Sequence, residues 1–125
     1  MTYPKLKGGD RIAIAAPSRK VDLANITPAI QLLENRGYLV SVASNLDSSR
    51  HNYLAGTDEE RITALQAFIN DPEVKAIFAV RGGYGVTRIL EQLDFNPLLK
   101  QPKWIVGFSD ITALHLKLDA LGLTS

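Results

Sequence analysis

Ser109 is the residue of this sequence best placed to act as a nucleophile. It follows the apolar run Trp104-Ile105-Val106-Gly107-Phe108 and precedes Asp110. A serine at a sharp strand-to-helix turn is typical of a nucleophile elbow, where the strained turn exposes the hydroxyl and the next amide helps to bind an oxyanion. The second glycine of the Gly-x-Ser-x-Gly pattern is missing, however. Because serine is also a favoured helix N-cap, the residues alone favour a capping role and leave the nucleophilic role open.

A glycine-rich segment, Arg81-Gly82-Gly83-Tyr84-Gly85, is the second candidate for chemistry. Glycine lets the backbone approach a ligand closely and adopt positive φ, so that N–H groups can point at an anion. The segment matches neither a Walker A loop nor the Gly-x-Gly-x-x-Gly fingerprint. A plain strand-to-helix turn, a phosphate cradle and an oxyanion hole all remain open. Arg81 could pair with a substrate carboxylate, or could hold Asp110 or another internal acid in place.

A nucleophilic serine needs a general base within hydrogen-bond reach, and the sequence offers few candidates. His115 lies six residues after Ser109, and helical spacing turns it to a different face. His51 belongs to a long loop, where a solvated side chain is the ordinary expectation. The acidic run Asp58-Glu59-Glu60 lies at a predicted helix start, where the helix dipole favours negative charge, so we interpret it as structural. The residues therefore provide no convincing catalytic triad.

These residues must be positioned by an α/β framework. Near-continuous apolar stretches alternate with segments of helical spacing, a pattern that favours βαβ units and a parallel sheet covered on both faces. We predict a three-layer, flavodoxin-like or Rossmann-like domain with a mainly parallel sheet flanked by helices. In such a sheet, ligands bind at the carboxyl ends of the strands. The four predicted strands are Arg11–Ala16, Tyr38–Ala43, Ala76–Val80 and Trp104–Phe108.

The first two helices have recognisable start signals. The first is predicted to begin at Thr27 as N-cap, with Pro28 in its first turn and Gly37 as its stop. The second is predicted to begin at a capping box formed by Thr57 and Glu60.

Two further helices are predicted after the third and fourth strands. The helix after the third strand is short and is expected to end before Asn96-Pro97. The last helix is expected to begin at Ser109 or Asp110. Its predicted buried face consists of Ile111, Leu114, Leu118 and Leu121.

Composition narrows the class of protein. The 125 residues fit one domain, and a formal net charge of +1 without clustered like charges gives no case for nucleic acid or an anionic membrane surface. Cysteine is absent, which excludes disulfides and thiolate sites and is compatible with a cytoplasmic location. We expect no membrane span. The sequence from Leu121 to Ser125 is typical of a helix stop followed by the start of another element, so we expect a truncated chain.

Several ordered segments together resemble the LD-carboxypeptidase family, serine peptidases that also include the microcin-immunity hydrolases. Any one of these motifs alone would be weak evidence, but their order from near residue 8 to the end is specific. The matching segments are Gly9–Ser18, Tyr53–Asp58, Arg61, Arg81–Gly85 and Pro102–Leu114.

The resemblance implies roles for individual residues. Ser109 would be the nucleophile, and the amide of Asp110 with that of Gly82 or Gly83 would form the oxyanion hole. Arg81 and Tyr84 would contact substrate. The family's histidine base and its orienting glutamate belong to a C-terminal domain that residues 1–125 do not include, so this chain alone is expected to be inactive.

The implied reaction is hydrolysis of an L–D peptide bond, without metal or organic cofactor. In murein-specific members the substrate is the tetrapeptide stem recycled in the cytoplasm, with release of terminal D-alanine. Immunity-type members instead hydrolyse an acyl-sulfamoyl adenylate conjugate. A different class remains possible, namely a non-catalytic flavodoxin-like module that binds phosphate or a nucleotide at the glycine turn. We also expect an exposed apolar surface where the partner domain would pack, and self-association, such as a homodimer, through it.

Overall fold

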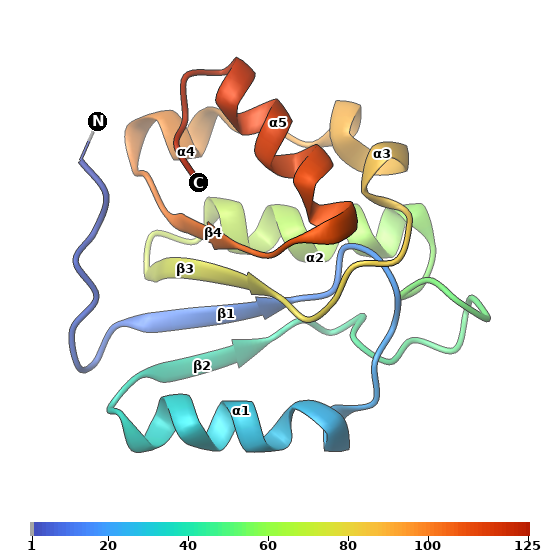
Figure 1. The fold of residues 1–125 in the computed structure, drawn as a ribbon, viewed down its shortest axis with the longest axis horizontal. Coiled ribbons are helices and arrows are strands. Elements are labelled where there is room, and N and C mark those ends of the chain that lie inside the picture. Colours follow the sequence, from blue (N-terminus) through green and yellow to red (C-terminus); the bar gives the residue numbers. More distant parts are fainter. Residues whose placement is uncertain (1) are drawn as a thin grey trace.

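Four parallel strands form the centre of the fold (Figure 1). The computed structural model describes residues 2–125. The sheet has the order β2-β1-β3-β4, and every neighbouring pair is parallel. All four strands therefore end at the same edge of the sheet. The strands are β1 (Arg11–Ala15), β2 (Leu39–Val42), β3 (Val74–Ala79) and β4 (Trp104–Val106).

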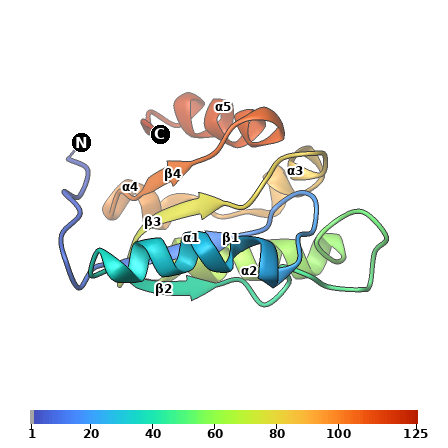
Figure 2. The same cartoon turned by 60° about the horizontal axis from the view of Figure 1, so that its bottom comes forward.

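Helices cover both faces of this sheet, as Figure 2 shows. Helix α1 packs on one face, where its residues Ile26 and Leu33 line a small space together with Ile14 of β1 and Phe78 of β3. The other helices contribute to the main core on the opposite face. The predicted three-layer α/β architecture is thus confirmed. The helices are α1 (Leu23–Asn35), α2 (Asp58–Asn70), α3 (Val86–Ile89), α4 (Asn96–Lys100) and α5 (Thr112–Ala120), with 3₁₀ turns at Leu90–Gln92 and Ser109–Ile111.

The main core lies between the sheet and helices α2, α3, α4 and α5. Strand residues Ala13, Ile77 and Ile105 lie opposite one another in register and belong to one buried cluster. Burial of such side chains stabilises the fold by about 1.5–3 kcal/mol for each large residue. The helical members of the cluster include Leu65, Ile69, Ile89, Leu98, Leu114 and Leu118.

The predicted capping box at the start of α2 is confirmed. The Glu60 amide donates to Thr57 Oγ1 at 3.1 Å, and the Thr57 amide donates to Glu60 Oε1 at 3.1 Å. The pKa of Glu60 is lowered, first by its bond from the Thr57 backbone. This box fixes where α2 begins, and so fixes the direction of the first helical turn beside the strand ends.

The predicted start of α1 is wrong. The helix begins at Leu23, after Asp22 in extended conformation, so Thr27 and Pro28 lie inside it. Thr27 Oγ1 donates to the Leu23 carbonyl at 2.9 Å. Pro28 cannot donate to the carbonyl one turn back, which belongs to the exposed Ala24. Because water can satisfy that carbonyl, the proline is tolerated here.

Two further differences concern the end of the chain's last third. The short helix α4, which the sequence pattern did not predict, begins at Asn96-Pro97. A proline is tolerated there because a residue in the first turn of a helix donates no helical hydrogen bond. Leu121 is 42% exposed, so its predicted burial is wrong. Gly122 turns the chain with a φ of 78°, and Leu123 takes the buried place at 3% exposure.

Strand β4 carries an exposed apolar stripe. Trp104 and Val106 are 38% and 43% exposed, and Phe108 directly after the strand is 80% exposed. Tyr3 packs on Trp104 with ring centroids 4.9 Å apart, and the indole N–H donates to the Pro4 carbonyl at 2.7 Å.

Within residues 2–125, no helix has the length and apolar character needed to cross a membrane.

Candidate active site

Ser109 occupies a strained turn directly after β4. Its φ is 61°, the only positive φ of a non-glycine residue among residues 2–125. A non-glycine residue in this region costs about 1–3 kcal/mol and persists only where the surroundings impose it. Phe108, in extended conformation, precedes the 3₁₀ turn, and no side-chain cap is formed. The capping interpretation of Ser109 is therefore wrong, and its exposed position matches a nucleophile elbow.

The glycine turn lies directly against Ser109. A Cβ atom at Gly82 would stand 3.0 Å from Ser109 Cβ, 3.2 Å from Ser109 Oγ and 3.1 Å from the Asp110 amide nitrogen. Gly83 and Gly85 have φ values of 121° and 124°, which only glycine adopts without strain. The amides of Gly82 and Gly83 donate none of the hydrogen bonds formed between loops. The structure thus brings together the residues predicted to form nucleophile and oxyanion hole.

We expect Gly82→Ala to disturb this contact without unfolding the domain. The new methyl group would meet Ser109 at 3.0 Å, so the elbow must shift by a few tenths of an ångström. Where Ser109 acts as the nucleophile, a displacement of that kind is expected to lower kcat by roughly 10²-fold. The free energy of unfolding, measured in urea, should change by less than about 1 kcal/mol. Gly8→Ala is a matched control because nothing lies within 4 Å of its added methyl. Equal activity of the two variants would contradict the assignment.

Asp110 ties the elbow to two other segments. Its Oδ2 accepts a hydrogen bond of 2.6 Å from Ser18 Oγ and one of 3.1 Å from the Val86 amide. Ser18 follows β1 and is fully buried. The possibility that Arg81 holds Asp110 is therefore wrong, because the carboxylate is held by a hydroxyl and a helix-start amide. The side chain of Asp110 positions the elbow, which leaves its backbone N–H as the group available to an oxyanion.

Arg61, which the sequence analysis named only as a family match without a role, is a buried clamp. Its side chain is fully buried in the first turn of α2, and its Nη1 donates to the carbonyls of Pro17 at 3.0 Å and Gly85 at 2.8 Å. Its Nη2 pairs with Asp58. Burial lowers the pKa of Arg61, and Asp58 opposes that effect. Arginine remains charged in proteins, so a buried cation holds the end of the glycine turn.

Arg61 and Asp110 act on adjacent residues of the same two loops. Arg61 holds Pro17 and Gly85, whereas Asp110 holds the next residue in each case, Ser18 and Val86.

The sequence signal that could have identified Arg61 as buried is its spacing from other residues of the helix. Arg61 precedes Leu65 and Ile69 at intervals of four, so an arginine occupies the buried stripe of α2. A charge at such a position points to a buried polar partner.

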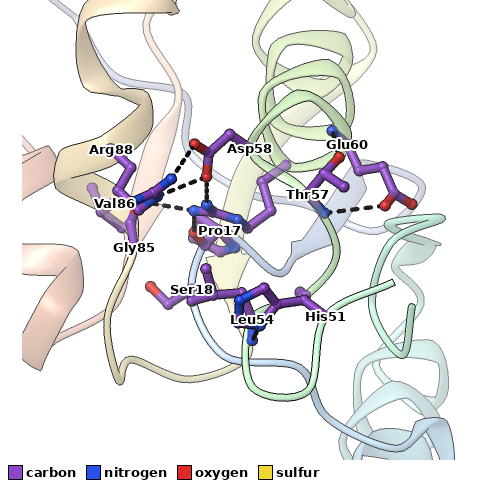
Figure 3. Close-up of polar contacts among 12 residues, drawn as sticks. Pro17, Ser18, His51, Leu54, Thr57, Asp58, Glu60, Gly85, Val86 and Arg88 are labelled. Atoms are coloured by element: carbon purple, nitrogen blue, oxygen red, sulfur yellow. Dashed lines mark hydrogen bonds and ion pairs between the residues drawn. The ribbon is translucent and has the colours of Figure 1, made fainter. Parts of the chain in front are cut away.

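Asp58 links this clamp to the surface. Figure 3 shows its carboxylate reaching toward Arg88, whose Nε and Nη2 donate to it at 2.9 and 2.8 Å. The hydrogen bond from Arg88 is the main cause that lowers the pKa of Asp58, with Arg61 adding to it. Asp58 is therefore an ionised counter-ion, which agrees with its predicted structural role.

Neither histidine faces Ser109. His115 Nε2 lies 3.1 Å from the Gly107 carbonyl and its Nδ1 lies 2.6 Å from Ser125 Oγ. His51 accepts hydrogen bonds at Nδ1 from the amides of Tyr53 and Leu54, at 3.0 and 2.9 Å, and Figure 3 shows its ring beside Leu54. His51 is exposed in its loop, as predicted, and its ring also closes that loop through these two hydrogen bonds. No group of three or more potential metal ligands occurs within residues 2–125.

The two predicted substrate-contacting residues lie in different hollows. Tyr84 lines an open cavity of about 640 Å³ together with His51, Tyr53 and Arg88. Arg81 lines a separate hollow of about 210 Å³. The two side chains, although only three positions apart in the glycine-rich segment, are thus directed to different surfaces of the domain.

Comparison with known proteins agrees with this arrangement. A probable murein peptide carboxypeptidase of Bacillus subtilis is 39% identical over 110 residues, which cover 88% of this chain and 34% of that protein. A muramoyltetrapeptide carboxypeptidase from Oxalobacter formigenes matches 90% of this chain and 38% of its own at 39% identity, with a TM-score of 0.80. An MccF-like protein from Bacillus anthracis matches 98% of this chain and 38% of its own at 31% identity, with a TM-score of 0.87.

The chain thus spans little more than a third of the length of these relatives. The model of the LD-carboxypeptidase N-terminal domain matches residues 12–125, nearly the whole sequence. The chain belongs to the LD-carboxypeptidase family, and the matched region corresponds to the family's N-terminal domain.

Proposed function

We propose that this chain is the nucleophile-bearing part of a serine LD-carboxypeptidase that hydrolyses an L–D peptide bond. The proposed substrate is the murein tetrapeptide in the cytoplasm, from which terminal D-alanine is released. One observation carries the proposal, namely the positive φ of Ser109 at the end of β4. A nucleophile elbow requires a strained backbone at an exposed serine, whereas a helix N-cap does not, so the strain favours the nucleophilic role.

In the proposed reaction, Ser109 Oγ attacks the scissile carbonyl carbon and its proton passes to a general base. The carbonyl oxygen becomes an oxyanion, which the amides of Asp110 and of Gly82 or Gly83 stabilise. The amine of D-alanine then leaves with a proton, and water hydrolyses the acyl-serine. Each preorganised amide donor in such a hole contributes about 2.7–4 kcal/mol to the lowering of the barrier. The contact between Gly82 and Ser109 supports this assignment.

The base and its orienting acid are proposed to lie outside residues 1–125, as a histidine and a glutamate of a further domain. Two observations support this. The side chains of His51 and His115 are engaged away from Ser109, and the relatives are far longer than this chain. The 125 residues alone are therefore expected to be inactive, and activity is a property of the longer protein, called here the full-length protein.

The full-length protein is expected to release D-alanine from a purified murein tetrapeptide. The measurement is chromatographic detection of released alanine of either configuration, with the all-L tetrapeptide as the control substrate, because an L–D peptidase would leave it intact. A serine-directed fluorophosphonate should modify Ser109, located by mass spectrometry of the digest. Absence of both turnover and labelling, together with saturable binding of inorganic phosphate or a nucleotide, would instead support a non-catalytic module.

A second substrate class is favoured by one observation. The MccF-like protein from Bacillus anthracis is 31% identical to this chain and superposes with a TM-score of 0.87. An aminoacyl-sulfamoyl adenosine is therefore the competing substrate to assay. Both substrates would use the same Ser109 chemistry, so the ratio of kcat/KM values decides between them. A ratio of at least tenfold in favour of the conjugate would overturn the murein proposal.

A further inference from the structure

A basic hollow lies beside the glycine turn. Its volume is about 210 Å³, and it contains three cationic side chains and one carboxylate. The carboxylate belongs to Asp22, which precedes α1 and makes no capping hydrogen bond. The hollow therefore has an excess of positive charge next to a proposed acyl-transfer site. Its lining residues are Arg19, Lys20, Val21, Asp22, Asn25, Asn52 and Arg81.

The hollow adjoins the proposed nucleophile through the backbone. The Arg19 amide donates to the Gly82 carbonyl at 3.3 Å, and Gly82 is the residue that packs against Ser109. Arg81 directly precedes Gly82. A Cβ at Gly83 would stand 3.0 Å from Arg19 Cβ. The two arginines thus flank the same turn that supplies the proposed oxyanion donors.

The two guanidinium groups of the hollow are not neutralised by the protein. Neither Arg19 nor Arg81 belongs to an ion pair formed among residues 2–125. The Arg19 guanidinium lies over the Tyr53 ring at 5.0 Å from the centroid. Lys20 Nζ donates to the His51 carbonyl at 2.8 Å. Arg19 and Lys20 are thus held by an aromatic ring and a backbone carbonyl, and Asp22 is the single carboxylate among the residues that line the hollow.

We propose that this hollow binds the C-terminal carboxylate of the peptide substrate, an inference that rests on the proposed function. In a carboxypeptidase substrate, one residue separates the attacked carbonyl from the terminal carboxylate, so the two groups lie roughly 4 Å apart. The carboxylate site must therefore lie close to the nucleophile. Arg81 directly precedes Gly82, where an added Cβ would stand 3.2 Å from Ser109 Oγ. A guanidinium matches a carboxylate with two parallel hydrogen bonds. The hollow makes the enzyme an exopeptidase, with Arg81 as the principal contact and Arg19 as the second.

The test uses a matched pair of probes with the 125-residue chain. N-acetyl-D-alanine carries the carboxylate, and N-acetyl-D-alaninamide has the same shape without the charge. In ¹⁵N NMR titrations we expect the first to bind in about the millimolar range, with shifts centred on Arg19, Asn25 and Arg81, and the second to bind at least tenfold more weakly. Arg81→Gln should weaken binding of the carboxylate probe roughly tenfold. Arg36→Gln, exposed after α1 and outside the hollow, should not.

Turnover in the full-length protein separates this inference from the proposed function. Arg81→Gln should raise KM about tenfold for the tetrapeptide with a free C-terminal carboxylate. The tetrapeptide with a C-terminal amide is expected to have a smaller kcat/KM from the start, and Arg81→Gln should leave that value nearly unchanged. Equal losses on both substrates, equal binding of both probes, or phosphate bound tenfold more tightly than the carboxylate probe would each overturn the inference. These outcomes do not depend on Ser109. Conversely, a Ser109→Ala protein that retains turnover defeats the proposed function while the probe titrations still test the hollow.

Discussion

Replacing Ser109 by alanine is expected to lower kcat/KM of the full-length protein on the murein tetrapeptide by roughly 10⁴- to 10⁶-fold. The reason is that the reacting hydroxyl is lost, and the neighbouring hydroxyl of Ser18 is fully buried and already donates to Asp110. The substrate KM should change little, because the oxyanion amides and the basic hollow remain. The measurement is D-alanine release under conditions where folding is verified by circular dichroism. Retention of more than a tenth of the activity would rule out Ser109 as the nucleophile.

Replacing Ser109 by glycine distinguishes the effect of backbone strain on stability from the effect of losing the hydroxyl on activity. Ser109→Gly should be as inactive as Ser109→Ala, yet it should raise the free energy of unfolding by roughly 0.5–1 kcal/mol, because glycine adopts a φ of 61° without strain. Ser44→Gly is the control, since Ser44 is exposed and has no positive φ. There glycine only adds entropy to the unfolded chain, so stability should fall. Urea unfolding that shows the same change for both variants would contradict strain at the elbow.

Removing the buried clamp is expected to have the largest effect on stability. Arg61→Leu should lower the free energy of unfolding by about 3–5 kcal/mol, because the carbonyls of Pro17 and Gly85 lose their donors and Asp58 loses a partner. The free energy of unfolding of Arg61→Lys should lie between those of the unaltered chain and Arg61→Leu, because a compact ammonium keeps the charge but does not reproduce the contacts of the planar guanidinium. The measurement is urea-induced unfolding of the 125-residue chain.

Arg88→Ala is the matched control for Arg61. Arg88 also pairs with Asp58, at 2.8 Å, but its side chain is 49% exposed. Exposed ion pairs contribute little to stability, so the control should lose far less stability than Arg61→Leu. If the two variants lose the same stability, the guanidinium of Arg61 does not hold the glycine turn as described.

The sequence predicted the framework well because its signals are local. Continuous apolar runs identified the four strands, and the spacing of Thr57 and Glu60 identified the capping box, both of which depend on neighbouring residues. The errors arose where a local signal has two uses. Pro28 was interpreted as part of the first turn of a helix, although it lies within one. Pro97 does follow the end of the preceding helical segment, as predicted, but it also opens a further helix.

The candidate site was predictable only in part because its contacts are long-range. Ser109 and Gly82 were identified as separate motifs, and their contact followed from the meeting of strand ends. The bond from Ser18 to Asp110 joins residues 92 apart in the sequence, and no periodicity indicates it. The φ of Ser109 likewise results from what surrounds the turn. Without that value, an elbow and an N-cap look alike in the sequence.

In the part of the chain that the structure describes, β4 is the edge strand of the sheet and pairs with β3 alone. The glycine turn follows that neighbour, β3, so Gly82 approaches Ser109 from the β3 side. Within residues 2–125 no strand pairs with the other edge of β4, and Phe108, directly before Ser109, is 80% exposed. A carbonyl whose oxygen points toward β3 presents a single prochiral face to Oγ. The position of β4 would thus set the stereochemistry of attack, and would require the proton acceptor to arrive from the other edge of β4.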